Sequence, residues 1–323
     1  MARSLTIWAL CDDRAGNVNQ VRGVAEALGL PFLIQDLTYT AAAALPNYMV
    51  GATFSGLTRD ARINLAPPWP DLVIAAGRRT APVARAIKEK TDGQCFLLQV
   101  MYPGEAGIDE FDLVAVPHHD KMPKRDNFFE VLGAPHRLNK GNLAAAAKAW
   151  EGRFDHLPGP RIALIVGGST KRKVFTSEMG AELGRLASKL ANSKNGSLMV
   201  TTSRRTGEAA DALIEAIDAP SHLFKWGDEG DNPYLGYMAV ADAVIVTGDS
   251  VSMCSESCAV SRPTYIYAPK KVTVRKHAML HQELYAQGFA RPLEGELSLD
   301  WTHPELNVAD QIADELLLRL KRE

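Results

Sequence analysis

The sequence predicts an α/β protein made of two doubly wound, Rossmann-like domains. Short apolar segments alternate with amphipathic helical segments along the whole chain, which is typical of parallel sheets flanked by helices. The alternation stops at the Pro-Gly-Pro of residues 158–160 and then starts again. The 323 residues, 46% of them hydrophobic, are enough for two domains that each have a core.

The first half contains the elements of one parallel sheet. An apolar run at residues 5–10 predicts the first strand, and apolar residues recur at helical spacing from Val18 to Leu28 after it. A later strand ends at Gly77 and passes into a helical pattern over residues 80–90. We expect about five strands in this half, at residues 5–10, 32–38, 71–76, 95–101 and 113–116.

The second half shows the same arrangement. We predict strands at residues 161–166, 198–202, 222–226, 243–247 and 264–267, with helices that include residues 178–190 and 207–217. An alanine-rich helix ends at Trp150, shortly before the Pro-Gly-Pro break, so the predicted domains are residues 1–150 and 151–323. The last amphipathic helix, at residues 304–321, is expected to pack back on the N-terminal domain.

Composition excludes several classes of protein. Thirty-six Lys plus Arg against 38 Asp plus Glu give a net charge of -2, so we expect no nucleic-acid partner. Every apolar run is far shorter than the ~20 residues that span a bilayer, so we expect no transmembrane segment. The four scattered cysteines indicate reduced thiols, and the N-terminal residues lack a signal-peptide pattern. These features favour a cytoplasmic protein.

The loop after the first predicted strand carries two carboxylates. We expect the two domains to face each other across a cleft, and such folds bind ligands at the carboxyl ends of their strands. Asp12 and Asp13 stand at such an end and suit the acceptance of a hydroxyl proton. The loop lacks the Gly-x-Gly-x-x-Gly of a dinucleotide site. A helix start with solvated carboxylates would favour the same residues, and this alternative stays open.

Two more strand ends of the first half carry polar side chains. Arg78, Arg79 and Thr80 follow one strand, and His118 and His119 follow another. Either histidine could act as a general base near neutral pH, or lie at the surface without a catalytic role.

Strand ends in the second half suit a diphosphate. Gly167, Gly168 and Ser169 precede three cations, and glycines let backbone amides approach an anion. This loop lacks P-loop spacing, so nucleotide hydrolysis is not indicated. Ser203 and Arg204 end the next strand, and Ser250 precedes Glu256, which could accept a hydrogen bond from a sugar hydroxyl. A glycine turn with a solvated basic run, and a Ser-to-Glu helix cap, are the alternatives.

Several motifs together resemble the mitochondrial-fission, elongated-mitochondria family, and the chain resembles a bacterial member. The motifs follow one another in the family's order over nearly the whole chain and comprise Asp12-Asp13-Arg14-Ala15-Gly16-Asn17-x-Asn19-Gln20, Gly77-Arg78-Arg79-Thr80-Ala81-Pro82, Pro117-x-His119-Asp120, Gly167-Gly168-Ser169, Thr201-Thr202-Ser203-Arg204-Arg205-Thr206, Asn232-Pro233-Tyr234, Thr247-x-Asp249-Ser250-x-Ser252-Met253-x-Ser255-Glu256, Lys276-His277 and Gly288-Phe289-Ala290-Arg291-Pro292.

The resemblance implies a glycosyltransferase of the GT-B type, in which the C-terminal domain binds a nucleotide-sugar. The residues implied on the donor side are Gly168, Ser169, Ser203, Arg204, Trp226, Asp249, Ser250, Ser252, Met253 and Glu256. Those implied on the acceptor side are Arg14, Asn17, Gln20, Arg78 and Thr80, with Asp12, Asp13 and His119 as catalytic candidates. Many family members carry histidine where this chain has Asn17, so Asp13 is our first choice for the base.

We therefore expect a sugar transferase that needs neither a metal ion nor a cofactor. Its donor would be a nucleotide-sugar, and its acceptor a lipid-linked or cell-envelope hydroxyl compound. Peripheral contact of the protein with a membrane is compatible with such an acceptor. Two alternatives stay open. One is a nucleotide-sugar epimerase of the GT-B fold, and the other is a non-catalytic scaffold that recruits a protein partner.

Overall fold

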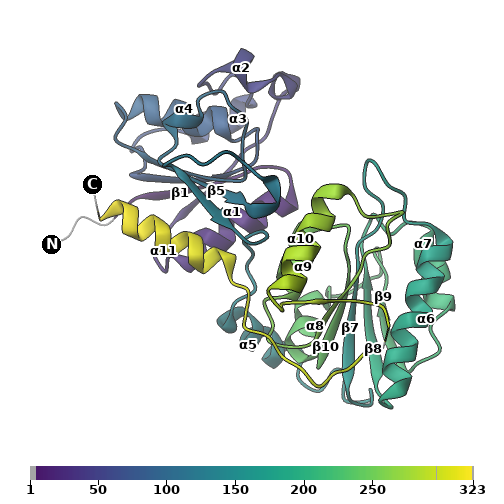
Figure 1. Cartoon of the computed structure of the whole chain (residues 1–323). Coiled ribbons are helices and arrows are strands. Elements are labelled where there is room, and N and C mark those ends of the chain that lie inside the picture. Colours follow the sequence, from purple (N-terminus) through teal and green to yellow (C-terminus); the bar gives the residue numbers. More distant parts are fainter. Residues whose placement is uncertain (1–4, 296, 322–323) are drawn as a thin grey trace. The chain divides into compact units, whose positions relative to one another are not determined.

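Parallel strands form two six-stranded sheets in the computed structural model, which describes residues 5–295 and 297–321 (Figure 1). The chain divides into two units with one sheet each. The first unit contains the chain up to Arg137 and again from Asn307, and the second is Leu138–Leu306. The predicted α/β class and the two doubly wound sheets are confirmed.

The sheet of the first unit has the strand order β2-β1-β3-β4-β5-β6. Its strands are β1 (Ile7–Cys11), β2 (Leu33–Asp36), β3 (Leu72–Ala76), β4 (Phe96–Val100), β5 (Leu113–Pro117) and β6 (Phe128–Val131). The helices of this unit are α1 (Ala15–Ala27), α2 (Asn47–Val50), α3 (Arg59–Asn64), α4 (Ala81–Lys90) and α11 (Val308–Leu320). All five residues of β1, β3, β4 and β5 are buried, as expected of strands covered on both faces.

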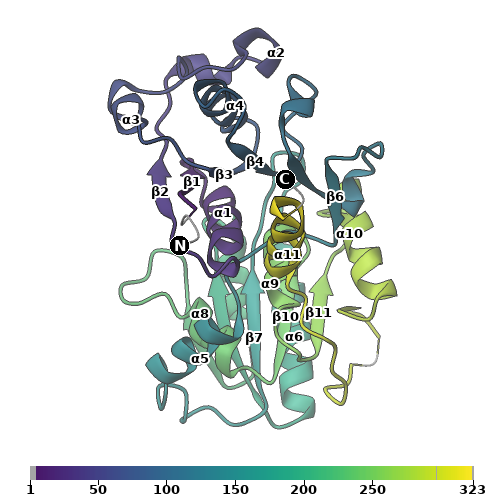
Figure 2. The ribbon, with the colours of Figure 1, turned by 90° about the vertical axis from the view of Figure 1, so that its left-hand side faces the viewer.

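Helix α11 joins the first unit although it follows the second in the sequence. It packs against α1 and β6, and the yellow ribbon of α11 lies beside α1 in Figures 1 and 2. Val308, Ile312 and Leu316 recur at helical spacing and are fully buried. Arg319 Nη1 donates to the carbonyl oxygens of Asp112 and Asp126, at 3.0 and 3.1 Å.

The sheet of the second unit has the order β12-β11-β10-β7-β8-β9. Its strands are β7 (Arg161–Val166), β8 (Ser197–Thr202), β9 (Ser221–Phe224), β10 (Ala243–Thr247), β11 (Thr264–Tyr267) and β12 (Arg291–Pro292). Its helices are α5 (Lys140–Ala149), α6 (Ser177–Ser193), α7 (Ala209–Glu215), α8 (Tyr234–Val240), α9 (Val251–Ser257) and α10 (Arg275–Ala286). Leu183 and Ala187 of α6 pack with Leu164 of β7 in the core of this unit.

The division between the units lies after Arg137, earlier than the position after residue 150 that the sequence predicts. The reason is that α5 packs against α8 of the second unit. Just after α5, the Trp150 and Phe154 rings stack 5.5 Å apart, and Phe154 lies 5.3 Å from the Tyr237 ring of α8. The Pro-Gly-Pro break therefore lies inside the second unit, directly before β7.

Two strands are absent from the sequence prediction. In β6, which is at the edge of its sheet, only Val131 is buried, so the apolar periodicity is weak. Strand β12 has two residues, too few for a sequence pattern.

Candidate functional site

Each sheet has one point at which its strand order reverses. In the first unit β1 lies between β2 and β3, and in the second unit β7 lies between β8 and β10. Ligands of doubly wound sheets bind at such a reversal, outside the carboxyl ends of the strands. The candidate sites are therefore the loops after β1 and β3 in one unit, and the loops after β7 and β10 in the other.

In the first unit, Arg79 joins the two carboxylates of the loop after β1. Its Nη2 is 3.2 Å from Asp12 Oδ2 and is also bonded to Asp13 Oδ1, while Nη1 donates to Asp13 Oδ2 at 3.2 Å. The Asp12 side chain is 1% exposed and that of Asp13 is 61% exposed. The hydrogen bonds from Arg79 lower the pKa of the Asp13 carboxyl, which keeps Asp13 ionised and makes it a weaker base.

Asp12 also organises the loop itself. Its Oδ2 accepts from Asn17 Nδ2 at 2.9 Å, and its Oδ1 accepts from the backbone amide of Arg14 at 2.9 Å. The guanidinium of Arg79 lies 4.5 Å above the ring of Tyr39. The structure thus brings together Asp12, Asp13 and Asn17, and adds Arg79 and Tyr39 to them.

Three of the acceptor-side candidates are hydrogen-bonded to the backbone or buried within the first unit. Arg78 donates to the carbonyl oxygens of Leu45 and Ala43 at 2.6 and 2.9 Å, so it holds the segment before α2. Thr80 is buried, and its hydroxyl donates to the carbonyl oxygen of Ala76 at 2.9 Å. Gln20 is buried in α1. Arg14, by contrast, is exposed at the start of α1.

The histidine candidate lies apart from the reversal point in strand order. His119 belongs to a turn that follows β5, and β3 and β4 stand between β5 and β1 in the sheet. Its side chain is 1% exposed, and Nε2 is 3.5 Å from Asp120 Oδ1. A base so enclosed has little access to a substrate hydroxyl.

In the second unit, the loops after β7, β8 and β10 contact one another. The Ser203 hydroxyl donates to the carbonyl oxygen of Gly167 at 2.8 Å, and Thr247 Oγ1 accepts from the Gly167 amide at 2.7 Å. Gly168 has φ +149°, and a Cβ there would lie 2.1 Å from the carbonyl oxygen of Arg205. Only glycine fits this position. Ser169 follows, and its Oγ accepts from the Phe175 amide at 3.0 Å.

Arg205 pairs with a buried carboxylate between these loops. Its Nη1 lies 2.5 Å from Asp249 Oδ2 and donates to the carbonyl oxygen of Ser169 at 3.2 Å. The Asp249 side chain is 2% exposed, so Arg205 neutralises a charge that would be costly to bury alone. Arg204 is exposed beside it. Of two consecutive arginines, one therefore holds the loops together and the other stays at the surface.

Glu256 is a second buried carboxylate of this unit. Its Oε2 accepts a hydrogen bond from the Tyr234 hydroxyl, and the residue is 8% exposed. Burial raises the pKa of the Glu256 carboxyl to about 7, and the hydrogen bond from Tyr234 works in the opposite direction. The carboxyl therefore changes its charge near neutral pH.

The other donor-side candidates surround the start of α9 and the end of β9. Ser250 caps α9, with Oγ accepting from the Met253 amide at 3.3 Å, and Ser252 lies with Met253 in the first turn. The backbone amide of Trp226 donates to Thr202 Oγ1 at 2.8 Å. This contact fixes Trp226 at the end of β8, with the residue 59% exposed.

Sequence reasoning did not assign roles to Arg79, Tyr39, Arg205 and Tyr234, although three of them lie within the quoted motifs. Arg79 and its partner Asp13 are 66 residues apart in the sequence, and Tyr234 and Glu256 are 22 apart, so no local sequence pattern predicts these contacts. The positions of Arg79 and Arg205 just after strand ends were the usable signals.

Within residues 5–295 and 297–321, no cluster of three or more His, Cys, Asp or Glu side chains could hold a metal ion. In the same residues no helix has the length and apolar character needed to cross a membrane.

Two Rossmann-like sheets of this topology define the GT-B fold, which glycosyltransferases and nucleotide-sugar epimerases share. UDP-GlcNAc 2-epimerase from Methanocaldococcus jannaschii superimposes with a TM-score of 0.58 at 11% identity, covering 99% of this chain and 100% of that chain. The enzyme of the same name from Neisseria meningitidis has a TM-score of 0.54 at 10% identity, with the same coverage.

The chain belongs to the Mitochondrial fission ELM1 family, whose model matches residues 15–320. Uncharacterized protein RP120 of Rickettsia prowazekii is 26% identical over 98% of this chain and 99% of its own length. Mitochondrial fission protein ELM1 of Arabidopsis thaliana is 28% identical over 84% of this chain and 68% of its own. The family resemblance expected from the motifs is confirmed.

Proposed function

We propose that this protein is a sugar transferase whose donor is a nucleoside-diphosphate sugar bound by the second unit. The observation that carries the proposal is the meeting of three strand-end loops at the reversal point of the sheet, joined by the Ser203–Gly167 and Arg205–Asp249 contacts. A glycine-rich loop, hydroxyls and an exposed cation converge there, as a diphosphate requires.

Individual roles follow from the contacts. Arg204 is exposed and would meet the diphosphate, with Ser169 and Ser250 donating from neighbouring loops. Oε2 of Glu256 is bonded to Tyr234, so Oε1 would accept a hydrogen bond from a hydroxyl of the donor. Gly168 would let the backbone approach the donor closely, and Trp226, Ser252 and Met253 would line the rest of the donor site. The proposal includes no metal ion.

In the proposed reaction the oxygen of an acceptor hydroxyl attacks the anomeric carbon of the donor. The bond from that carbon to the diphosphate breaks, and the nucleoside diphosphate leaves. The first unit would bind the acceptor, and Asp13, the more exposed of its two loop carboxylates, would take the hydroxyl proton. Asp12 would orient the loop. The acceptor would be a lipid-linked or cell-envelope hydroxyl compound, and the protein would act in the cytoplasm.

An epimerase is the second candidate, because the two solved structures described above carry that activity in their names and one of them holds UDP-GlcNAc. The two reactions are separable by their products. A transferase releases nucleoside diphosphate only when an acceptor or water takes the sugar, whereas an epimerase returns an isomeric nucleotide-sugar.

The experiment that tests donor binding is a thermal-unfolding screen with uridine, cytidine, guanosine and adenosine diphosphates. A ligand at 100 times its Kd that binds only the folded state stabilises it by about 2.7 kcal/mol, so one nucleotide should raise the Tm by several degrees. Ser250→Ala and Glu256→Gln should reduce the rise. If a folded sample responds to none of the four, a non-catalytic scaffold becomes the better account.

A further inference from the structure

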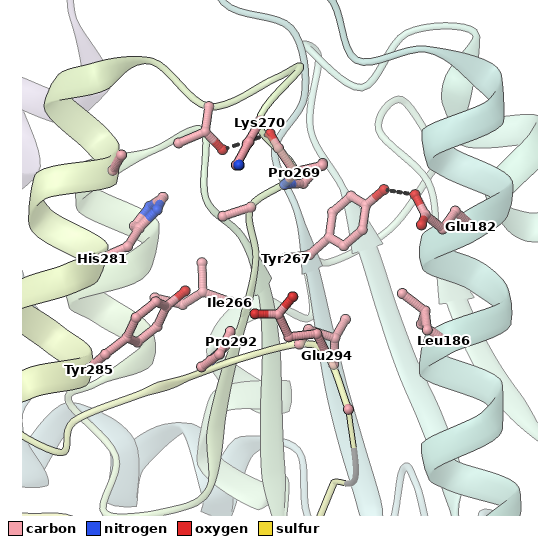
Figure 3. Close-up of a pocket in the computed structure, with 15 residues that line it drawn as sticks. Glu182, Leu186, Ile266, Tyr267, Pro269, Lys270, His281, Tyr285, Pro292 and Glu294 are labelled. Carbon is pink, nitrogen blue, oxygen red and sulfur yellow. Dashed lines mark hydrogen bonds between the residues drawn. The ribbon is translucent and has the colours of Figure 1, made fainter.

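The second unit contains a cavity that the proposed donor loops do not line. It has a volume of about 510 Å³ and lies between α6 and α10, over β11 and the residues after it (Figure 3). This volume is in the usual range of small-molecule sites. Its floor is apolar and aromatic, with Ile266 and Tyr267 buried and Pro292 beside them.

Glu182, Glu294 and Lys270 are the Asp, Glu, Lys or Arg side chains that line the cavity, and His281, Thr273, Tyr267 and Tyr285 supply further polar groups. Glu182 of α6 and Glu294, which follows β12, are exposed carboxylates at its mouth. In Figure 3 the carboxylate of Glu294 points into the space between Tyr267 and Tyr285. Lys270 is the lysine among the lining residues, so the two carboxylates outweigh it.

The Tyr267 hydroxyl fixes one of these carboxylates. It donates to Glu182 Oε2 at 2.6 Å. Burial, and next the hydrogen bond to Glu182, raise the pKa of Tyr267, so the phenol stays neutral and remains a donor. This hydrogen bond orients the Glu182 side chain, and the other carboxyl oxygen can accept a further hydrogen bond.

We propose that this cavity binds a small organic amine, with a protonated primary amino group at the carboxylates and an aliphatic chain on the floor. Primary ammonium groups donate three hydrogen bonds and suit two carboxylates at a rim. The faces of Tyr267 and Tyr285 would attract the same charge. Anionic ligands would be repelled by Glu182 and Glu294. None of the residues proposed for the donor lines this cavity, although Ala268 and His281, which do line it, lie against Gly248 of the loop after β10.

The test is calorimetry with 1-aminobutane at constant ionic strength, with 1-butanol as the uncharged control of equal chain length. We expect saturable binding of the amine and none of the alcohol. Equal responses to both compounds, or no binding of the amine to a cooperatively folded sample, would overturn the proposal.

Variants connect the binding to this cavity. Glu182→Gln and Glu294→Gln keep the shape and remove the charge, and the glutamine oxygen at position 182 can still accept from Tyr267. Because both carboxylates are exposed, each change should weaken binding about threefold, and both together about tenfold. Glu178→Gln, also on α6 but outside the cavity, should leave the affinity unchanged. Undiminished affinity in the double variant would place the amine elsewhere.

Discussion

The hydroxyl of Tyr234 donates a hydrogen bond to Oε2 of Glu256, joining the first residue of α8 to the helix that follows β10. The carboxylate is buried, and burial raises its pKa to about 7. The hydrogen bond holds Oε2 in place and favours the ionised carboxylate, which opposes the effect of burial. A group that titrates near neutral pH is therefore oriented at the proposed donor site.

Glu256→Gln should change how the stability of the protein depends on pH. The folded-state pKa of Glu256 is raised from 4.5 to about 7, so its protonation stabilises the fold fully below pH 4.5. This contribution is lost as the pH rises through 7. From pH 5 to pH 8 the wild-type protein should lose ~1 kcal/mol or more of unfolding free energy relative to the variant, measured by urea denaturation.

Glu178→Gln is the control for that comparison. The carboxyl of Glu178 is exposed, and a hydrogen bond from Thr176 lowers its pKa. Its contribution is therefore lost only at more acidic pH, and the difference between this variant and wild type should stay constant from pH 5 to pH 8. A constant difference for Glu256→Gln as well would refute the raised pKa.

Arg205 and Arg204 should behave differently although they are neighbours. Arg205→Ala leaves the buried Asp249 without its cation and should cost about 3 kcal/mol of stability, the lower end of the range for a buried pair, because Arg205 is itself 37% exposed. Adding Asp249→Asn should restore part of the loss. Arg204→Ala should alter stability by less than about 0.5 kcal/mol and weaken nucleoside-diphosphate binding about tenfold or more. Denaturation and calorimetry would measure the two effects, and equal destabilisation by both changes would contradict this assignment.

Asp13→Asn tests the proposed base of the first unit. The change keeps shape and hydrogen bonding but removes the basic oxygen, so turnover should fall roughly 10²–10⁴-fold while donor affinity stays the same. Kinetics with the nucleotide that passes the binding screen would measure it. Full activity in the variant would assign proton transfer to another group or to water.

The pKa of Asp13 can be tested without a substrate. Hydrogen bonds from Arg79 lower it, so Arg79→Met should return the carboxyl toward its ordinary pKa of 3.8. Carboxyl ¹³C chemical shifts recorded across a pH titration would show the change. An identical titration curve for Asp13 in both proteins would mean that the ion pair is not populated in solution.

Helix α11 should contribute much of the stability of the first unit. Ile312→Ala removes a fully buried side chain from its contact face and should cost about 2–5 kcal/mol. Leu318→Ala, at a position 51% exposed on the same helix, should cost about 0.5 kcal/mol or less. In the Ile312→Ala variant, amide hydrogen exchange should accelerate in α1 and β6 but not in the second unit. Uniform acceleration throughout the chain would contradict this division.

The amino-acid sequence was sufficient for the class of fold and for the positions of the loops that follow the buried strands. Buried parallel strands consist of continuous apolar runs, so the sequence predicts β1, β3, β7 and β10. The end of each run also gives the position of the carboxyl end of the strand. The role of Gly168 can also be predicted from the sequence. A pair of glycines after a strand indicates a position where another group approaches the backbone too closely for a side chain to fit. Helix α11 is recognisable as amphipathic from the spacing of its apolar residues.

The partners of the polar side chains depended on the tertiary structure. Arg204 and Arg205 are chemically identical and adjacent, and the path of the loop after β8 decides which one reaches Asp249. Arg79 meets Asp12 and Asp13 because β3 lies beside β1 in the sheet, a neighbourhood set by strand order and not by sequence distance. Periodicity reports burial along one element, whereas an ion pair between elements requires the relative position of both. For the same reason, the sequence showed Glu256 as an ordinary carboxylate, and only its burial beside Tyr234 raised its pKa toward neutrality.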